Sequence, residues 1–224
     1  MEVWKAAGKD LTLFPSARDN APLVLLHTCG DEGESVARQV RAMTDADHAF
    51  AAIGGLRWED EMSPWECPPI FRGEPPFTGG ADAYLALLTQ EILPGILSRL
   101  SAAPAYLALA GYSLAGLFAV YASYRTDLFS RIASASGSFW FPGFPEFAAN
   151  HEPERTPDRV YFSLGDQEAK SRNRILRTVE DHTRALRERL ERAGAKTVFA
   201  RNPGSHFRDA PKRMAKGIAW ILGA

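Results

Sequence analysis

The stretch that decides the fold is residues 105–124, AYLALAGYSLAGLFAVYASY. Its opening residues are apolar and have the length of a buried strand, while its second half has the composition of a packed helix. The turn GYSLAG, residues 111–116, lies between them. A strand that runs through such a turn directly into a helix is the context in which α/β proteins hold a nucleophilic serine. We therefore predict that Ser113 points its hydroxyl out of the edge of a sheet.

The neighbours of Ser113 are small, as a strained turn requires. Gly111 precedes it, Gly116 follows it, and Ala115 stands where the motif G-x-S-x-G has its second glycine. Alanine is the next smallest residue, so the steric requirement is nearly met. The turn would place the hydroxyl at the positive end of a helix, where the Leu114 N–H can face a developing oxyanion. The alternative is a packed Gly-Ser turn without chemistry.

Short apolar runs alternate with helical patterns along the whole chain. This alternation predicts an α/β fold with a mostly parallel central sheet and helices on both faces. No internal repeat or low-complexity linker interrupts it, so we expect a single domain over residues 1–224. The expected strands are 23–27, 48–53, 105–110, 131–135, 160–164 and 197–200, after an antiparallel start at 2–6 and 11–15. The expected helices are 35–43, 82–100 with a bend or break at Pro94, 114–124, 171–193 and 211–222.

Residues 57–80 form the least regular stretch. They hold five of the fifteen prolines and show no clear hydrophobic period. We expect a long loop over the sheet edge, and long loops of this kind often line a site. The connection between the last strand and the last helix is too short for a large lid.

His206 is the candidate general base. In α/β proteins with a serine nucleophile, the acid and then the histidine follow the serine along the chain. His151, His182 and His206 follow Ser113. Only His206 lies in a turn-forming segment between an apolar strand and the terminal helix, where a loop can carry an imidazole over the strand ends.

The candidate acid lies in the segment GDQE, residues 165–168, directly after an expected strand. An acid that orients a histidine must lie in such a turn. Aspartate is the commoner residue type, but Glu168 has the better spacing from the glycine. We favour Glu168 and keep Asp166 as the alternative acid, since Asp166 could instead cap the following helix.

The loop after the first central strand is expected to supply a second oxyanion donor. The backbone N–H groups of Thr28 and Cys29 are the candidates there. Aromatic residues in loops after strands, or beside Ser113, are expected to line a substrate pocket, although each could instead pack in the core. These residues are Tyr112, Trp58, Trp65, Phe139 and Trp140.

The composition argues against several functions. With 26 basic and 27 acidic side chains, the chain has almost no net charge, so no overall positive potential attracts nucleic acid or an anionic membrane. The N-terminal residues lack a secretory signal, and no apolar run approaches the roughly 20 residues that span a bilayer. Cys29 and Cys67 lack metal-ligand spacing, and no nucleotide-binding glycine motif occurs. We expect a cytoplasmic protein without a metal; nothing indicates a homo-oligomer, although one remains open.

The sequence resembles the putative-esterase branch of the α/β-hydrolases, which includes enterochelin esterase-like, feruloyl esterase-like and S-formylglutathione hydrolase-like enzymes. The segments that carry the resemblance are GYSLAGLFAVYASY (111–124), SASGSFW (134–140), SLGDQE (163–168) and NPGSHF (202–207).

The resemblance implies an α/β-hydrolase fold and hydrolysis of a small carboxylic ester through an acyl-enzyme. It implies that Ser113, His206 and an acid at Glu168 or Asp166 do the chemistry, with neither a metal nor an organic cofactor. A thioesterase or acyltransferase that uses the same Ser-His pair, and a non-catalytic binding module of the same fold, remain the alternatives.

Overall fold

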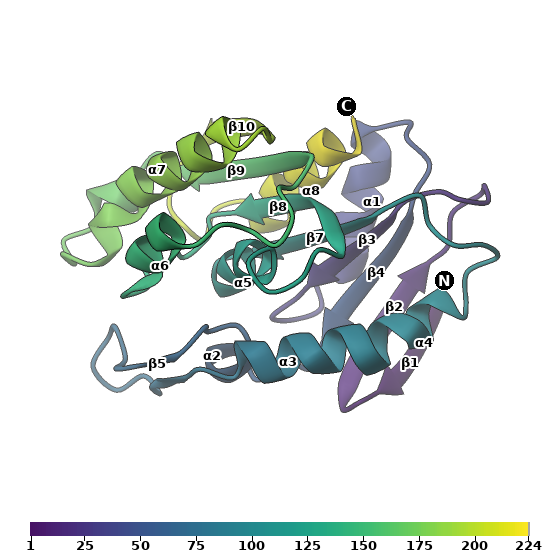
Figure 1. The fold of residues 1–224 in the computed structure, drawn as a ribbon, viewed down its shortest axis with the longest axis horizontal. Helices are drawn as coiled ribbons and strands as arrows, with labels where there is room; N and C mark the ends of the chain where they lie inside the picture. The colour runs from purple at the N-terminus through teal and green to yellow at the C-terminus, as the bar shows by residue number, and fades with distance from the viewer. Residues whose placement is uncertain (224) are drawn as a thin grey trace.

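The computed structural model describes residues 1–223 and, within them, places an eight-stranded sheet at the centre of the molecule (Figure 1). The order of the strands is β1-β2-β4-β3-β7-β8-β9-β10. The pairs β1–β2 and β2–β4 are antiparallel, and every pair from β4 to β10 along this order is parallel. The predicted α/β class, the parallel sheet and its antiparallel start are confirmed. The bounds are β1 Glu2–Ala6, β2 Lys9–Phe14, β3 Leu23–His27, β4 Ala49–Gly54, β7 Leu107–Tyr112, β8 Phe129–Ala135, β9 Arg159–Gly165 and β10 Lys196–Asn202.

Helices cover both faces of the sheet (Figure 1). One face carries α1 (Gly33–Met43) and α8 (Ala210–Leu222), which also contact each other. The helices of the other face are α3 Ala81–Leu87, α4 Leu93–Leu97, α5 Leu114–Ala122, α6 Phe144–Asn150 and α7 Val179–Arg192.

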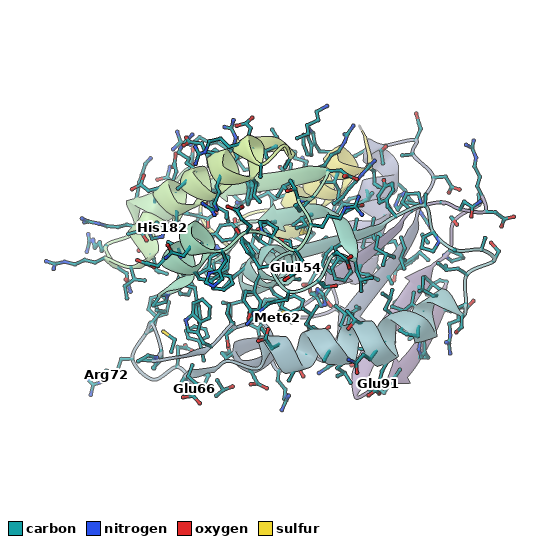
Figure 2. The ribbon with its side chains drawn as sticks, in the orientation of Figure 1. Met62, Glu66, Arg72, Glu91, Glu154 and His182 are labelled. Carbon is teal, nitrogen blue, oxygen red and sulfur yellow. The ribbon has the colours of Figure 1, made fainter. Side chains whose placement is uncertain are left out.

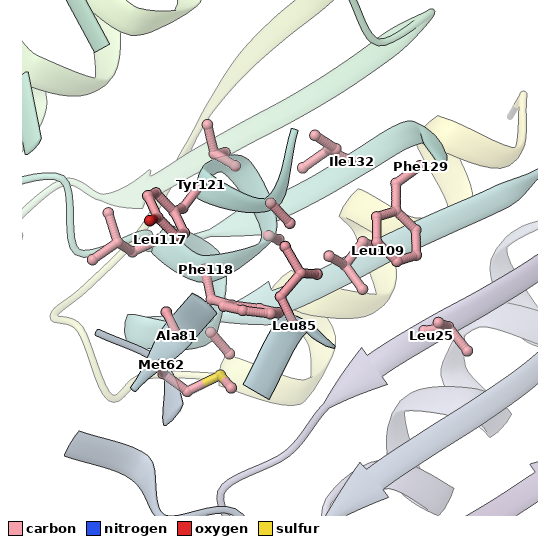
Figure 3. Close-up of a cluster of buried hydrophobic side chains, with 14 of the residues drawn as sticks. Leu25, Met62, Ala81, Leu85, Leu109, Leu117, Phe118, Tyr121, Phe129 and Ile132 are labelled. Atoms are coloured by element: carbon pink, nitrogen blue, oxygen red, sulfur yellow. The ribbon is translucent and has the colours of Figure 1, made fainter. Parts of the chain in front are cut away.

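The central strands are apolar throughout because both of their faces are covered. In β3, Leu23 and Leu25 belong to the core under α5, while Val24 and Leu26 belong to the core under α1 and α8. Figure 3 shows part of the first core, in which Leu109 of β7 lies beside the side chains of α5. This two-sided burial fixes the ends of the parallel strands, from which the loops of the site emerge.

Helix α7 begins later than the helix expected at 171–193. Residues 176–178 form a single 3₁₀ turn, and α7 begins at Val179. The Asn173 side chain accepts hydrogen bonds from the N–H groups of Ile175 (2.9 Å) and Leu176 (3.4 Å). Such local side-chain bonds compete with the helix. Ile175 lies within the predicted helix but is exposed, whereas Val179 is buried.

The expected break at Pro94 takes the form of a π-helical turn. Residues Leu88–Ile92 have π-helical hydrogen bonding and join α3 to α4, whose first turn contains Pro94. The backbone stays helical from the π turn into α4, and proline is tolerated here because the π turn before it disrupts the regular hydrogen bonding of the α-helix. The last turn expected, up to residue 100, is absent, because α4 ends at Leu97.

The segment 57–80 is less irregular than expected. It contains the short helix α2 (Trp58–Glu61) and a hairpin of β5 (Glu66–Cys67) and β6 (Phe77–Thr78). Glu66 and Arg72 extend outward from this hairpin in Figure 2. Of the helices within residues 1–223, none combines the length and the apolar character needed to cross a membrane.

We expect Phe118→Ala to lower the free energy of unfolding by about 3–5 kcal/mol, the usual cost of emptying a fully buried aromatic site. Phe118 has no exposed surface and contacts the rings of His27 and Tyr84, at centroid distances of 5.2 and 5.3 Å. Urea unfolding measures the effect. Phe71→Ala is the matched control, since Phe71 is 54% exposed, and it should change stability by less than about 1 kcal/mol. Equal effects of the two substitutions would contradict this account of the core.

Candidate active site

Ser113 lies in a strained turn between β7 and α5. Its φ of +59° and ψ of −123° are rare for a residue with a side chain. Two backbone bonds hold the turn: the Ser113 N–H donates to the Ala135 carbonyl (3.1 Å), and the Ser138 N–H donates to the Ser113 carbonyl (3.1 Å). These bonds come from β8 and the loop after it, so the neighbouring strand sustains the strain.

The alanine at position 115 is accommodated because residue 111 has no side chain. A Cβ atom on Gly111 would lie 2.3 Å from the backbone of Ala115 and 2.7 Å from its methyl group. The departure from the G-x-S-x-G pattern thus leaves the turn intact, while a side chain at residue 111 would force the strand and the helix apart.

The structure brings Ser113, His206 and Glu168 together in one chain of contacts. His206 Nε2 lies 3.0 Å from Ser113 Oγ, and His206 Nδ1 lies 2.8 Å from Glu168 Oε2. The alternative acid, Asp166, instead accepts a hydrogen bond from the Gly204 N–H at 2.9 Å, two residues before His206. Of the two carboxylates, Glu168 contacts the imidazole, and Asp166 secures the loop that carries it.

The carboxylate of Glu168 is almost completely surrounded by donors. Its Oε1 accepts hydrogen bonds from the Gly165 N–H (2.6 Å), the Ser136 hydroxyl (2.6 Å) and the Arg213 guanidinium (2.9 Å). Burial by itself would raise the pKa of Glu168, but the hydrogen bonds from His206 and Ser136, the charge of His206 and the bond from the Gly165 N–H lower the pKa to about 2. Glu168 is therefore ionised at neutral pH.

Close backbone contact places the His206 loop beside the acid. A Cβ atom on Gly165 would lie 2.3 Å from the Gly204 carbonyl oxygen, so only glycine fits at residue 165. The Tyr112 hydroxyl donates to the His206 carbonyl at 2.7 Å. Burial raises the pKa of Tyr112 to about 12, which keeps this donor protonated.

Arg213 on α8 is a buried cation that joins several parts of the site. Its side chain is 2% exposed, contacts Ser136 and Glu168, and reaches the Ser205 carbonyl at 3.3 Å. Its guanidinium also lies over the ring of Tyr112, 5.4 Å from the centroid. Arg213 therefore compensates the buried charge of Glu168 and ties α8 to the loop of His206.

The expected oxyanion donors differ in their availability. The Leu114 N–H lies at the first position of α5, where a helix has no acceptor of its own. The Thr28 N–H donates to the Ile53 carbonyl at 3.0 Å as an extension of the sheet, so it is not free to serve. The Cys29 N–H points away from the sheet and donates to the side chain of Glu32 at 3.0 Å.

A cavity of about 430 Å³ opens above Ser113 between α1, α2 and α8. Of the five aromatic residues expected to line a pocket, Trp58 and Tyr112 line this cavity. Its lining residues are Leu26, His27, Cys29, Glu32, Val36, Trp58, Tyr112, Ser113, His206, Phe207, Ala210, Pro211 and Met214.

The other three aromatic residues pack elsewhere, so the prediction for them is wrong. The ring of Trp65 packs on Phe141, and its indole N–H donates to the Pro142 carbonyl at 2.9 Å. Phe139 is buried and stacks on Phe144; Trp140 packs on Phe77 and Phe141. Phe139 and Trp140 follow β8 and Trp65 follows α2, but all three turn toward the core beneath α6.

Several residues of the site are not evident in the sequence. Ser136 lies within the SASGSFW segment but carries no motif of its own, and Arg213 is one of 26 basic residues. Glu32 and Met214 reach the cavity only because α1 and α8 lie side by side. The positive φ of Ser136 (+47°) is a property of the folded backbone that cannot be predicted from the serine in the sequence.

The remaining histidines after Ser113 lie outside the site. The Nδ1 atom of His182, on α7, is 3.0 Å from the Phe139 carbonyl oxygen, and His151 stacks on Phe147. Within residues 1–223, no three His, Cys, Asp or Glu side chains are grouped closely enough to hold a metal ion.

Comparison with known proteins relates the chain to ester hydrolases. The family described as "Putative esterase" matches residues 24–210. The "Uncharacterized protein YbbA" of Bacillus subtilis (strain 168) is 26% identical over 172 residues, which are 73% of this chain and 69% of that protein.

Solved structures show the same fold. An IroE-like serine hydrolase from Shewanella oneidensis superposes with a TM-score of 0.78 at 16% identity, over 99% of this chain and 79% of that one. The siderophore hydrolase EstB from Aspergillus nidulans gives 0.68 at 17% identity, over 99% and 96%. The expected α/β-hydrolase fold and the resemblance to the putative-esterase branch are confirmed.

We expect ionised Glu168 to contribute about 3 kcal/mol to the free energy of unfolding, from a pKa that falls from 4.5 to about 2 on folding. Because folding lowers this pKa, the contribution is complete above about pH 5 and is lost as the pH falls toward 2. The difference in unfolding free energy between the wild type and Glu168→Gln should shrink by that amount between pH 6 and pH 2. Urea unfolding at a series of pH values measures it, and a difference that stays constant would contradict the assigned environment of Glu168.

Proposed function

Since the chain belongs to the putative-esterase family, whose match spans residues 24–210, we propose that it hydrolyses a small carboxylic ester by acyl transfer through Ser113. The observation that carries the proposal is the line of contacts from Ser113 Oγ through His206 to Glu168, at 3.0 and 2.8 Å. A serine, a base and an orienting acid in this geometry form the constellation that activates a hydroxyl nucleophile.

In the first step, Ser113 Oγ attacks the ester carbonyl carbon while its proton passes to His206 Nε2. The tetrahedral intermediate then collapses. The bond to the alcohol oxygen breaks, and the alcohol leaves with the proton that His206 returns to it. The product of this step is an acyl ester on Ser113.

In the second step, a water molecule takes the place of the alcohol. His206 Nε2 removes a proton from the water, whose oxygen attacks the acyl carbon. The second tetrahedral intermediate collapses with return of the proton to Ser113 Oγ, which releases the carboxylic acid and restores the free enzyme.

Glu168 orients the base and stabilises it when it is protonated. A carboxylate 2.8 Å from Nδ1 keeps a proton on that nitrogen, so that Nε2 is free to accept one from Ser113. The pKa of Glu168 near 2 means that the acid does not itself take the proton. Arg213 supports this role because it holds the carboxylate in place on the side away from His206.

The Leu114 N–H is the first donor to the oxyanion, at the positive end of α5. The Cys29 N–H is the candidate for the second donor. It donates to Glu32 Oε1, and the oxyanion would share or replace that acceptor while the Gly30 N–H continues to hold the Glu32 carboxylate.

The same residues would serve a thioesterase or an acyltransferase, because the chemistry at Ser113 does not specify the leaving atom or the final acceptor. A non-catalytic binding module is the alternative from another class. The contacts of His206 with both Ser113 and Glu168 argue against it, since a binding site does not require them.

We expect Ser113→Ala to lower kcat/KM for 4-nitrophenyl acetate by about 10³-fold or more, because the nucleophile is removed. A fluorophosphonate probe should label the wild type on one serine and should leave Ser113→Ala unlabelled. Circular dichroism provides the control for folding. Full turnover by a folded Ser113→Ala protein would exclude the mechanism, and an unlabelled, inactive wild type would favour the binding module.

Exchange of the two carboxylates separates their roles. We expect Glu168→Gln to lower kcat by about 10²–10⁴-fold, because an amide can neither stabilise the imidazolium nor enforce the required tautomer. Asp166→Asn keeps an oxygen that can accept the Gly204 N–H, so its loss in kcat should be at least about tenfold smaller. Steady-state kinetics on one aryl ester compare the two variants, and a larger loss for Asp166→Asn would reassign the acid.

A further inference from the structure

Glu32 brings a fixed carboxylate into the cavity above Ser113. It directly precedes α1, and its side chain turns back over the loop after β3. Glu32 Oε1 accepts the Cys29 N–H at 3.0 Å, and Oε2 accepts the Gly30 N–H at 2.9 Å. Two backbone donors therefore hold the negative charge at the wall of the cavity. A flexible surface carboxylate would instead turn toward the solvent.

Apart from the catalytic pair, Tyr112, His27 and Cys29, the rest of the lining is apolar. Leu26, Val36 and Met214 form the deep wall, and Trp58 and Phe207 form the mouth. Among the described residues that line the cavity, none is Lys or Arg. An anionic substrate group would lose its hydration there without gaining a cationic partner, which is costly in an apolar environment.

A second carboxylate acts on the same side of the cavity. Burial, followed by the charges of Glu32 and Glu59, raises the pKa of the Cys29 thiol. Glu59 follows Trp58 on α2, so the two acids flank the part of the lining that Cys29 and Trp58 form. Both acids therefore add negative charge near Cys29.

Three cations on the neighbouring elements are paired with acids. Arg213 contacts Glu168 at 2.9 Å, Arg57 contacts Asp60 and Glu61 at 2.9 and 3.2 Å, and Arg208 lies 3.7 Å from Asp209. None of the three lines the cavity. The charge of Glu32 is thus left without an opposing guanidinium at the place where a substrate enters.

We infer that Glu32 is a specificity-determining residue, which makes this cavity accept esters of uncharged, apolar acids and alcohols and reject anionic esters. The inference rests on the proposed function, because it assumes that the cavity receives the substrate of Ser113. Two like charges about 6 Å apart, at an effective dielectric constant of about 20, repel strongly enough for up to about a hundredfold in an equilibrium. Screening by salt reduces this to about tenfold at a partly open site.

Matched pairs of substrates isolate the charge from the shape. Mono-4-nitrophenyl adipate and 4-nitrophenyl heptanoate differ by a carboxylate on the acyl side. The anion of 4-acetoxybenzoic acid and its methyl ester differ by a carboxylate on the alcohol side. For each pair, the ratio of kcat/KM for the neutral ester to that for the anionic ester is measured in the wild type and in Glu32→Gln, so that differences in intrinsic reactivity cancel.

We expect the wild type to prefer the neutral member of each pair and Glu32→Gln to lower that ratio by about tenfold in at least one pair. Added salt should increase the turnover of the anionic ester by the wild type and should do so less in the variant. Glu34→Gln is the control, because Glu34 is an exposed acid on α1 outside this cavity, and it should leave the ratios unchanged.

Equal ratios in the wild type and Glu32→Gln would overturn the inference, as would a wild type whose turnover of the anionic esters does not respond to salt. The salt series needs no variant, so the test stands even if Glu32→Gln folds poorly. Failure of the proposed function would look different: turnover of the neutral esters would then be absent or would survive Ser113→Ala.

Discussion

The site depends on one buried carboxylate, that of Glu168. Its two oxygens accept hydrogen bonds from the end of β9 (Gly165), the loop after β8 (Ser136) and α8 (Arg213), and they contact the loop after β10 (His206). A buried carboxylate is tolerable only when its lone pairs are satisfied. Since each partner comes from a different segment, satisfying this charge also fixes the positions of four segments, and this arrangement determines where His206 lies.

The serine turn is governed by steric exclusion instead of charge. Ser113 adopts a positive φ because the strand must reverse into α5 within a few residues, and Gly111 permits this by leaving space for the backbone of Ala115. Gly165 plays the same part beneath the His206 loop, where the Gly204 carbonyl occupies the space of a side chain. The two ends of the Ser-His contact thus rest on positions at which a single added carbon would push the elements apart.

These causes explain what the sequence could predict. Strand–helix alternation and the GYSLAG turn predict the sheet and place Ser113, because both are local patterns. The choice of Glu168 over Asp166 followed from spacing, yet the roles of Ser136 and Arg213 depend on which loops meet in space, and no local pattern records that. The side chain of Asn173 shortens α7 through hydrogen bonds to the backbone, which the spacing of hydrophobic residues in the sequence does not reveal. Trp65 and Phe139 lie in connections where pocket residues were expected, but both pack against aromatic side chains of the core beneath α6.

In the proposed mechanism, the chemistry and the specificity of this site are carried largely by different parts of the fold. Ser113, His206 and Glu168 are held by loops at the carboxyl ends of parallel strands, and their bonds form a closed network with α8 through Arg213. The cavity wall comes instead from α1 and from the outer turns of α8, where Val36 and Met214 supply shape and Glu32 supplies charge. Substitutions along α1 can therefore change which ester fits without disturbing the bonds that hold the serine and the histidine. A fold arranged in this way can keep one reaction while its substrates diverge.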